Sequence, residues 1–255
     1  MMHLPVTHGP VLMPHPTLPD LSQIPKRPTV LPWGGAWLGM HACALMLTLL
    51  FGLLPLDIWL QDPHYKAGSF VGAGNWWVEV FSHRWVKWMV LVSAVVVWLR
   101  VFTSPRWPAD RSVNRRWLAV GIALVLAPAS VATLKHFSTK PCPWDLTRYG
   151  GSIAETTIFP FTPVNAVGQC FPAGHASTGF ALFAFVLLWR GRNPRMARWV
   201  WSLAFVAGLL LGWGQQLRGA HFLSHTLWSA WVCWAVCLLV DDTLGRFMPT
   251  SEARS

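Results

Sequence analysis

Six apolar runs divide the chain, and all but the fourth are about as long as a helix must be to cross a bilayer; the fourth is short, so we expect its ends to be buried in protein. A helix rises 1.5 Å per residue, so about 20 residues span the hydrocarbon core. Inside lipid the backbone must satisfy its own hydrogen bonds, which a helix does within one segment. We therefore expect an all-α integral membrane protein with six transmembrane helices in a bundle, over the ranges 37–54, 85–102, 117–134, 175–189, 199–217 and 222–240.

The composition supports a membrane protein and argues against other classes. Charged residues make up 12% of the 255 residues, whereas a soluble domain carries about 25%. This deficit argues against a soluble enzyme and against a disordered protein. Lysine and arginine number 20 against 10 acidic residues, but in so apolar a chain basic loops indicate membrane topology and not a nucleic-acid partner. The 18 tryptophans fit this interpretation, because indole rings settle at the headgroup level.

The apolar runs define three parts of the chain. Residues 1–35 are rich in proline and histidine and have no helical period, so we expect a flexible cytoplasmic tail. Residues 36–241 are expected to form the membrane domain, and residues 242–255 a second cytoplasmic tail. Within the membrane domain, residues 55–87 mix tryptophan with polar residues, which indicates a segment lying at the membrane interface.

Two clusters of arginine predict the orientation of the bundle. In a six-span topology both clusters lie on the same side as the two termini, and basic loops stay in the cytoplasm. The segment 135–174 and the turn at 218–221 then face outward. We expect the inner membrane of a bacterium, with the outward face in the periplasm. The clusters are Arg106, Arg111, Arg115 and Arg116 after the second run, and Arg190, Arg192, Arg195 and Arg198 after the fourth.

The five cysteines fall into two groups. Cys142 and Cys170 both lie in the outward segment, and the bacterial periplasm is oxidising. We predict a disulfide between them that pins this long loop over the site. Cys43, Cys233 and Cys237 lie inside the apolar runs, where cysteine serves as a small packing residue.

Three outward segments hold most of the unusual polar residues. They are residues 135–148 with the sequence KHFSTKPCPWDLTR, residues 171–177 with FPAGHAS, and residues 215–225 with QQLRGAHFLSH. Ionisable side chains at membrane depth are costly, so they mark functional sites by default. Their position on one side of the membrane predicts a single outward-facing active site.

These segments resemble the three motifs of the type 2 phosphatidic acid phosphatase superfamily. The family pattern is Lys-x6-Arg-Pro, then Pro-Ser-Gly-His, then Ser-Arg-x5-His-x3-Asp, and its bacterial lipid phosphatases carry all three motifs on the outer side of six spans. The most specific matches are Pro-Ala-Gly-His at 172–175 and Gly-Ala-His-Phe-Leu-Ser at 219–224. The chain departs from the pattern at Cys142, Ala173, Gln215 and His225, which stand where the family has Arg, Ser, Arg and Asp.

The resemblance assigns roles to three histidines. It implies that His221 attacks phosphorus and that His175 protonates the leaving oxygen. Both tasks suit a side chain whose pKa is near neutrality. His225 follows His221 by four residues, about one helical turn. It would orient His221 by hydrogen bonding, as the Asp of the family does.

The phosphate oxygens need positively polarised partners, and the superfamily supplies lysine and arginine in place of a metal. Backbone N–H groups at a helix start also bind anions. The phosphate-binding candidates are Lys135 and Arg218, then Lys140 and Arg148 as substitutes for the missing Arg, and the backbone at Gly174.

A metal site is the alternative for the histidines, because His221 and His225 have the i, i+4 spacing of a helical metal pair. We expect neither a metal nor another cofactor, since no Glu accompanies the pair and Lys135 and Arg218 would repel a cation.

The function implied by the resemblance is that of a membrane phosphatase working through a phosphohistidine. Its partner would be a phosphorylated membrane lipid such as lipid A, undecaprenyl diphosphate or phosphatidylglycerol phosphate. Two alternatives remain open at this point. One is a phosphotransferase that passes the phosphoryl group to a second lipid, and the other is a non-catalytic membrane protein that binds an anionic lipid head.

Overall fold

The structure, a computed structural model, describes residues 34–78, 86–104, 111–154 and 168–248. The chain separates into two compact units, residues 1–38 and residues 39–255. The first unit is described only over residues 34–38, which form the start of a helix. The expected tail over residues 1–33 therefore lies outside the described residues, and the architecture below is that of the second unit.

The described chain is mostly helical, as the sequence predicts. The exception is a hairpin of two short antiparallel strands, β1 (Tyr65–Lys66) and β2 (Ser69–Phe70). Short 3-10 helices are η2 (Asp62–His64), η4 (Pro143–Asp145), η5 (Thr147–Tyr149) and η6 (Ala181–Leu188), the last continuing α5. The α-helices are α1 (Gly34–Leu53), α2 (Leu56–Gln61), α3 (Val86–Phe102), α4 (Arg111–His136), α5 (Gly174–Phe180), α6 (Pro194–Leu217) and α7 (Leu223–Phe247).

All six expected apolar runs are helical, but not all of them are long enough alone to cross a membrane. Helices α4, α6 and α7 are long and apolar enough, and α1 with α2 makes a fourth candidate that bends by 80° at the break. Helix α3 and the continuous α5–η6 segment are shorter apolar helices. The structure therefore supports a membrane protein with three or four candidate spans among the described residues.

Helix α7 continues to Phe247, seven residues beyond the predicted end of the sixth run at Val240. Part of the expected C-terminal tail is therefore helical. Helix α4 likewise begins at Arg111, six residues before the predicted start at Trp117. Both differences arise because the helices carry their charged residues inside their terminal turns, where an apolar run no longer marks them.

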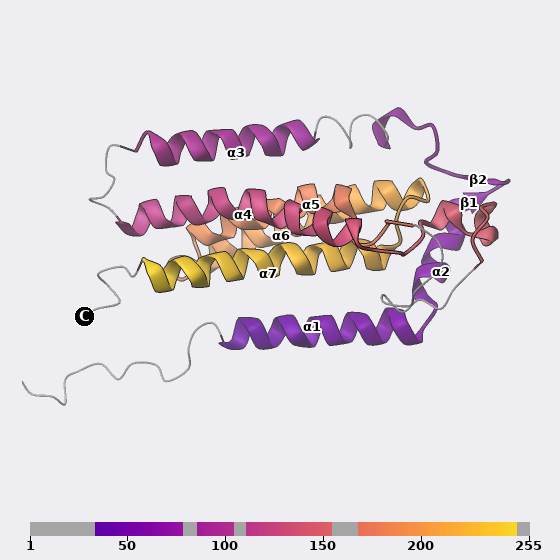
Figure 1. Cartoon of the computed structure of the whole chain (residues 1–255), viewed down its shortest axis with the longest axis horizontal. Helices are drawn as coiled ribbons and strands as arrows, with labels where there is room; N and C mark the ends of the chain where they lie inside the picture. The colour runs from indigo at the N-terminus through magenta and orange to yellow at the C-terminus, as the bar shows by residue number, and fades with distance from the viewer. Residues whose placement is uncertain (1–33, 79–85, 105–110, 155–167, 249–255) are drawn as a thin grey trace, which may run out of the picture. The chain divides into compact units, whose positions relative to one another are not determined.

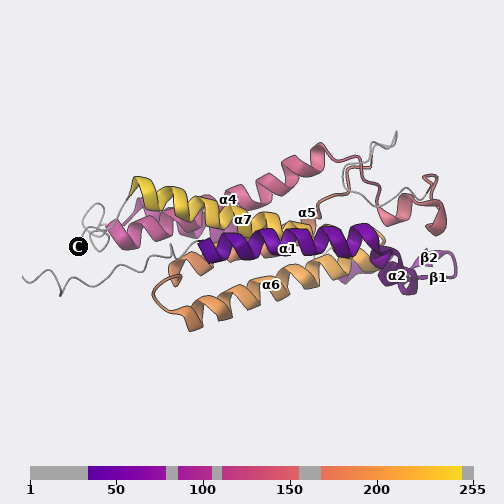
Figure 2. The same ribbon diagram turned by 90° about the horizontal axis from the view of Figure 1, so that it is seen from below.

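The core of the second unit lies between α4, α5–η6, α6 and α7, which run side by side in Figures 1 and 2. Helix α4 packs along α7, α5 packs along α6, and α3 packs on α4. Gly179 of α5 and Gly208 of α6 meet at this contact, where a Cβ on Gly208 would overlap the ring of Phe180. Small residues therefore let α5 and α6 approach closely, as is common between membrane helices.

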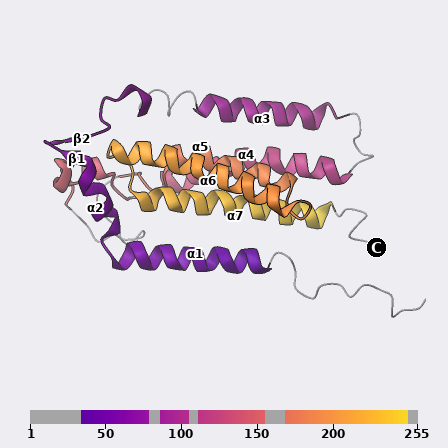
Figure 3. The ribbon, with the colours of Figure 1, turned by 180° about the vertical axis from the view of Figure 1, so that it is seen from behind.

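The bundle has two chemically different ends, which we name by what lies there. The loop end is formed by α2, the β1–β2 hairpin, residues 137–154 and the α6–α7 turn, and it is visible in Figures 1 and 3. The tail end is formed by the start of α4, the η6–α6 turn and the end of α7. At the tail end Asp241 pairs with Arg115 at 3.3 Å and with Arg190 at 3.8 Å. Arg116 donates to the carbonyl oxygens of Leu187 and Arg190, at 2.9 and 2.8 Å.

Candidate active site

The turn between α6 and α7 carries His221 and is held by contacts from two distant segments. Gly219 has φ +71°, and a Cβ there would overlap the ring of Phe70 in β2. Glycine is therefore required by both the backbone conformation and the space. The Trp144 N–H donates to the Gly219 carbonyl oxygen at 3.0 Å. The hairpin and the loop after α4 thus fix the turn that presents His221.

The start of α5 is joined directly to α7, which brings the second motif to the third. The Ala173 N–H donates to the His225 carbonyl oxygen at 3.1 Å. The Ser229 hydroxyl lies 3.0 Å from the Ala173 carbonyl oxygen and 2.9 Å from the His225 carbonyl oxygen. His175 follows as the second residue of α5. Its position relative to α7 is therefore set by backbone contacts.

The three histidines form a continuous row. The ring centroids of His175 and His221 are 6.3 Å apart, and those of His221 and His225 are 5.9 Å apart. His221 and His225 are only 2% and 4% exposed. Phe171 and Phe222 each meet the His225 ring edge-on at 5.4 Å. The row is therefore compact and is shielded by aromatic rings at one end.

Lys135 brings positive charge to this row from the last turn of α4. Gly174 lies beneath it, since a Cβ on Gly174 would sit 3.9 Å from Cδ of Lys135. Burial lowers the pKa of the His221 imidazole well below its ordinary value, and the neighbouring imidazoles and Lys135 lower it further. His221 is therefore a neutral imidazole at pH 7, the form that can act as a nucleophile.

The predicted disulfide is present, since Cys142 and Cys170 are bonded with their Cα atoms 5.2 Å apart. Its Cys170 sulfur lies 3.5 Å from the carbonyl oxygen of Ala220, the residue before His221. The Cys170 N–H also donates to the Lys140 carbonyl oxygen at 3.0 Å. The disulfide therefore attaches the ends of the long loop directly above the α6–α7 turn. The three remaining cysteines are unbonded, and Cys233 and Cys237 are buried.

The other predicted phosphate ligands are distributed differently from Lys135. Arg148 forms a bidentate ion pair with Asp62, with N–O distances of 2.8 and 2.6 Å, and Asp62 also accepts from the Tyr149 hydroxyl at 2.9 Å. Arg218 donates to the side-chain oxygen of Gln215 at 3.1 Å. Its guanidinium thus reaches the position where the resemblance expects an arginine.

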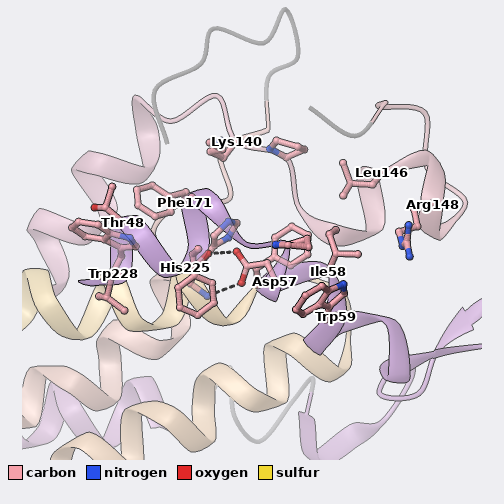
Figure 4. A pocket seen from close by; sticks show the side chains of 17 residues that line it. Thr48, Asp57, Ile58, Trp59, Lys140, Leu146, Arg148, Phe171, His225 and Trp228 are labelled. Atoms are coloured by element: carbon pink, nitrogen blue, oxygen red, sulfur yellow. Dashed lines mark hydrogen bonds between the residues drawn. The ribbon is translucent and has the colours of Figure 1, made fainter. Parts of the chain in front are cut away.

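Lys140 lies on the opposite side of His225, in a cavity of about 410 Å³ that Figure 4 shows from close by. The cavity is lined by α1, α2, the loop after α4 and the first turns of α7. His225 faces it, but His175, His221 and Lys135 are not among its lining residues. Burial lowers the pKa of the Lys140 ammonium, and the Asp57 carboxylate partly restores it. His225 therefore belongs both to the row of histidines and to the wall of this cavity.

Asp57 is a site residue that the sequence did not reveal. It belongs to α2, is 2% exposed, and accepts hydrogen bonds from both the backbone N–H and the hydroxyl of Ser224. Ser224 is the second residue of α7, so Asp57 caps that helix from another segment, and a carboxylate is favourable at a helix N-terminus. The sequence offered one indication of this role, which is that an acidic residue follows shortly after the first apolar run, at the start of an outward segment.

Comparison with known proteins identifies the family. The model of the PAP2 superfamily matches residues 116–246. No curated protein and no solved structure gave a match. The match covers just over half of the chain and includes all three histidines, so the chain belongs to the PAP2 superfamily. Membership implies phosphatase-type activity on phosphate esters, which the resemblance of the three segments also predicts.

Proposed function

We propose that the protein is a membrane phosphatase that hydrolyses a lipid-linked phosphate or pyrophosphate at the outer face of a bacterial inner membrane. The observation that carries this proposal is the convergence of Lys135, His175, His221 and His225 at the loop end. These residues come from α4, α5, the α6–α7 turn and the start of α7, and the family match includes all four.

The chemistry begins with His221 as the nucleophile. A nitrogen of its neutral imidazole attacks phosphorus, the bond from phosphorus to the leaving oxygen breaks, and His175 gives its proton to that oxygen. Water then attacks the phosphohistidine, the P–N bond breaks, inorganic phosphate leaves, and the water proton passes to His175. The separation of 6.3 Å between the rings of His175 and His221 lets both contact one phosphoryl group.

The remaining groups stabilise charge and orientation in this scheme. Lys135 and the N–H groups at Gly174 bind the non-bridging oxygens, because a helix start and an ammonium both favour an anion. Arg218 extends the positive field toward the position of Gln215. His225 supports the orientation of His221 with its ring 5.9 Å away, while the backbone of Cys170 hydrogen-bonds the His221 imidazole and fixes its tautomer.

The topology of the proposal has six spans, in which α3 and α5–η6 complete the crossing helices. The two arginine clusters then lie in the cytoplasm with the tail end, and the loop end faces the periplasm. This orientation places the disulfide in an oxidising compartment, which agrees with the bond between Cys142 and Cys170.

Phosphate release from detergent-solubilised protein tests the proposal. The substrates are phosphatidylglycerol phosphate, lipid A and undecaprenyl diphosphate, each with EDTA present. We expect EDTA-resistant release from at least one lipid, and its loss in His221→Ala. Loss of phosphate from the donor lipid without release of inorganic phosphate, together with a newly phosphorylated second lipid, would instead indicate transfer. Tight binding of these lipids with no loss of phosphate would indicate a non-catalytic binder.

A further inference from the structure

The cavity beside His225 is amphipathic along its length. Its volume of about 410 Å³ is in the range of small-molecule sites, which measure roughly 300–1,000 Å³. Leu47 and Phe51 of α1 and Trp228 of α7 make one part of its wall apolar. Asp57 and Lys140 supply buried polar groups, as Figure 4 shows. A ligand that matches both parts must carry a hydrocarbon chain and a polar head.

The polar groups specify the chemistry of that head. Lys140 is 8% exposed and presents an ammonium to the cavity, which suits a phosphate oxygen. Asp57 lines the same cavity, and Ser224 supplies the two hydrogen bonds that it accepts there. An ionised carboxylate has about four acceptor positions, so Asp57 retains acceptor capacity for a donor on the ligand. Hydroxyl groups are the donors that lipid heads carry beside a phosphate.

We propose that this cavity binds a phosphate-bearing membrane lipid whose head carries hydroxyl groups on the glycerol or sugar next to the phosphate. Lys140 contacts the phosphate, Asp57 accepts a hydroxyl, and the chain lies against Leu47, Phe51 and Trp228. This inference deepens the proposed function and rests on it for the statement that the bound lipid is the substrate. It selects phosphatidylglycerol phosphate and lipid A over undecaprenyl diphosphate, which has no hydroxyl group in its head.

The position of the cavity assigns this selection to the N-terminal part of the chain. Leu47, Phe51 and Asp57 all precede residue 116, where the family match begins. The shared His225 connects the cavity to His221, whose ring lies 5.9 Å away. Segment 47–57 therefore adds the hydroxyl acceptor and part of the apolar wall to a cavity whose other residues, Lys140 and Trp228, lie within the family match.

Equilibrium binding to the full-length protein in detergent tests the proposal without relying on turnover. The probes are dioleoyl phosphatidylglycerol phosphate and undecaprenyl diphosphate, and all proteins carry His221→Ala so that neither lipid is consumed. We expect the glycerol lipid to bind at least about tenfold more tightly, the difference that one hydrogen bond to a charged group provides. In Asp57→Asn the amide can still bond Ser224 at both positions, but the charged acceptor is lost, and the preference should fall below about threefold.

The apolar wall is tested by filling it. Thr48 of α1 lines the cavity, and Thr48→Trp should weaken binding of both lipids by about tenfold. The matched control is Thr133→Trp on an exposed face of α4, where the hydroxyl makes the same bond to the carbonyl four residues back. Equal affinity of the parent for the two lipids, or unchanged binding by Thr48→Trp, would overturn the proposal. Selective binding with no phosphate release from any lipid would contradict the proposed function and leave this inference standing.

Discussion

Helix α7 meets a buried carboxylate at each of its ends, and the two carboxylates have different partners. At the tail end Asp241, a residue of α7 itself, is 5% exposed and is shared by Arg115 and Arg190. At the loop end Asp57, a residue of α2, is 2% exposed and accepts both hydrogen bonds of Ser224. The first carboxylate balances charge, whereas the second completes a helix end.

The surroundings of the two carboxylates extend this difference. The tail end joins opposite charges from α4, the η6–α6 turn and α7, so the buried Asp241 has two partners of opposite sign there. At the loop end, by contrast, Lys135 and the adjacent imidazoles lower the pKa of His221 beyond the effect of its burial, so these groups oppose one another's protonation. Paired opposite charges indicate a structural role, whereas a cluster of basic side chains without acidic partners of comparable number indicates a site that binds an anion.

The strongest test of this comparison is removal of the proposed nucleophile. His221→Ala should lower kcat/KM by about 10⁴-fold or more, because no other group can form the phosphohistidine. His136→Ala, an exposed histidine at the end of α4, is the control and should keep full activity. Thermal unfolding in detergent should be similar for both variants. Retained turnover in His221→Ala would move the nucleophile to another residue.

The neighbouring histidine separates orientation from attack. His225→Ala should slow phosphate release but leave a measurable rate, because His221 remains. His225→Asp should reach or exceed the parental rate, since a carboxylate stabilises the imidazolium that forms on His221. Steady-state kinetics on the same lipid distinguish these outcomes. An inactive His225→Asp together with an active His221→Ala would reverse the two assigned roles.

At the tail end the expected effect is on stability. Asp241→Ala removes the carboxylate that Arg115 and Arg190 share, and breaking such a buried pair costs about 3–5 kcal/mol. We expect a lower thermal midpoint in detergent, with kcat per folded molecule close to the parent. Loss of kcat without loss of stability would show that the two ends are not functionally separate.

The disulfide is predicted to contribute at the loop end. Its cysteines are 28 residues apart, and closing such a loop stabilises the folded chain by about 3–4 kcal/mol in the chain-entropy model. A double Cys142→Ser, Cys170→Ser variant should therefore unfold earlier and release phosphate more slowly, because the loop is no longer fixed above Ala220. Cys43→Ser, which removes an unbonded thiol from α1, should change neither property. Unchanged activity in the double variant would show that the loop is not needed to form the site.

Removal of the cap that Asp57 of α2 provides for α7 should have a smaller effect on stability than removal of the disulfide. Asp57→Ala removes an N-terminal cap, which costs about 0.5–2 kcal/mol, whereas Asp57→Asn keeps both hydrogen-bond positions and should cost less. In both variants the change in the free energy of lipid binding should exceed the change in the free energy of unfolding. Comparison of the two midpoints by thermal unfolding checks this order. A larger loss in Asp57→Asn than in Asp57→Ala would contradict the capping role.

The smallest expected effect concerns pH. Because the pKa of His221 is lowered, its neutral form persists as the pH falls below 6.5, and the acid limb of kcat/KM should lie below that value. Besides burial, His225, Lys135 and His175 lower the pKa of His221, and a hydrogen bond to the Cys170 backbone raises it. Lys135→Met removes the positive charge and should move the acid limb upward, by up to about one pH unit. A limb at or above 6.5 in the parent would mean that a different group controls it.

The helices were predictable because their apolar runs are longer than those that segments of a soluble protein carry. The meeting of His175 with His221 was also predictable, since matching family contexts surround both residues. The partner of Asp57 was not, because Ser224 lies 167 positions away and no local pattern connects them. The same holds for Arg148, whose pairing with Asp62 spans 86 positions. Sequence periodicity reports which face of a helix is apolar, but not which polar groups meet across the bundle.

The attachment of α2 to the loop end has a consequence for anyone who exchanges parts between relatives. Gln61 of α2 donates to the Gln216 carbonyl oxygen at 2.8 Å, and the Gln216 amide donates back to the Leu60 carbonyl oxygen at 3.2 Å. The Gly72 N–H similarly donates to the Leu217 carbonyl oxygen at 2.9 Å. A chimera that transplants only residues 116–246 would therefore lose these three hydrogen bonds unless the recipient chain supplied equivalent partners. Segment 57–72 must be exchanged together with the catalytic helices.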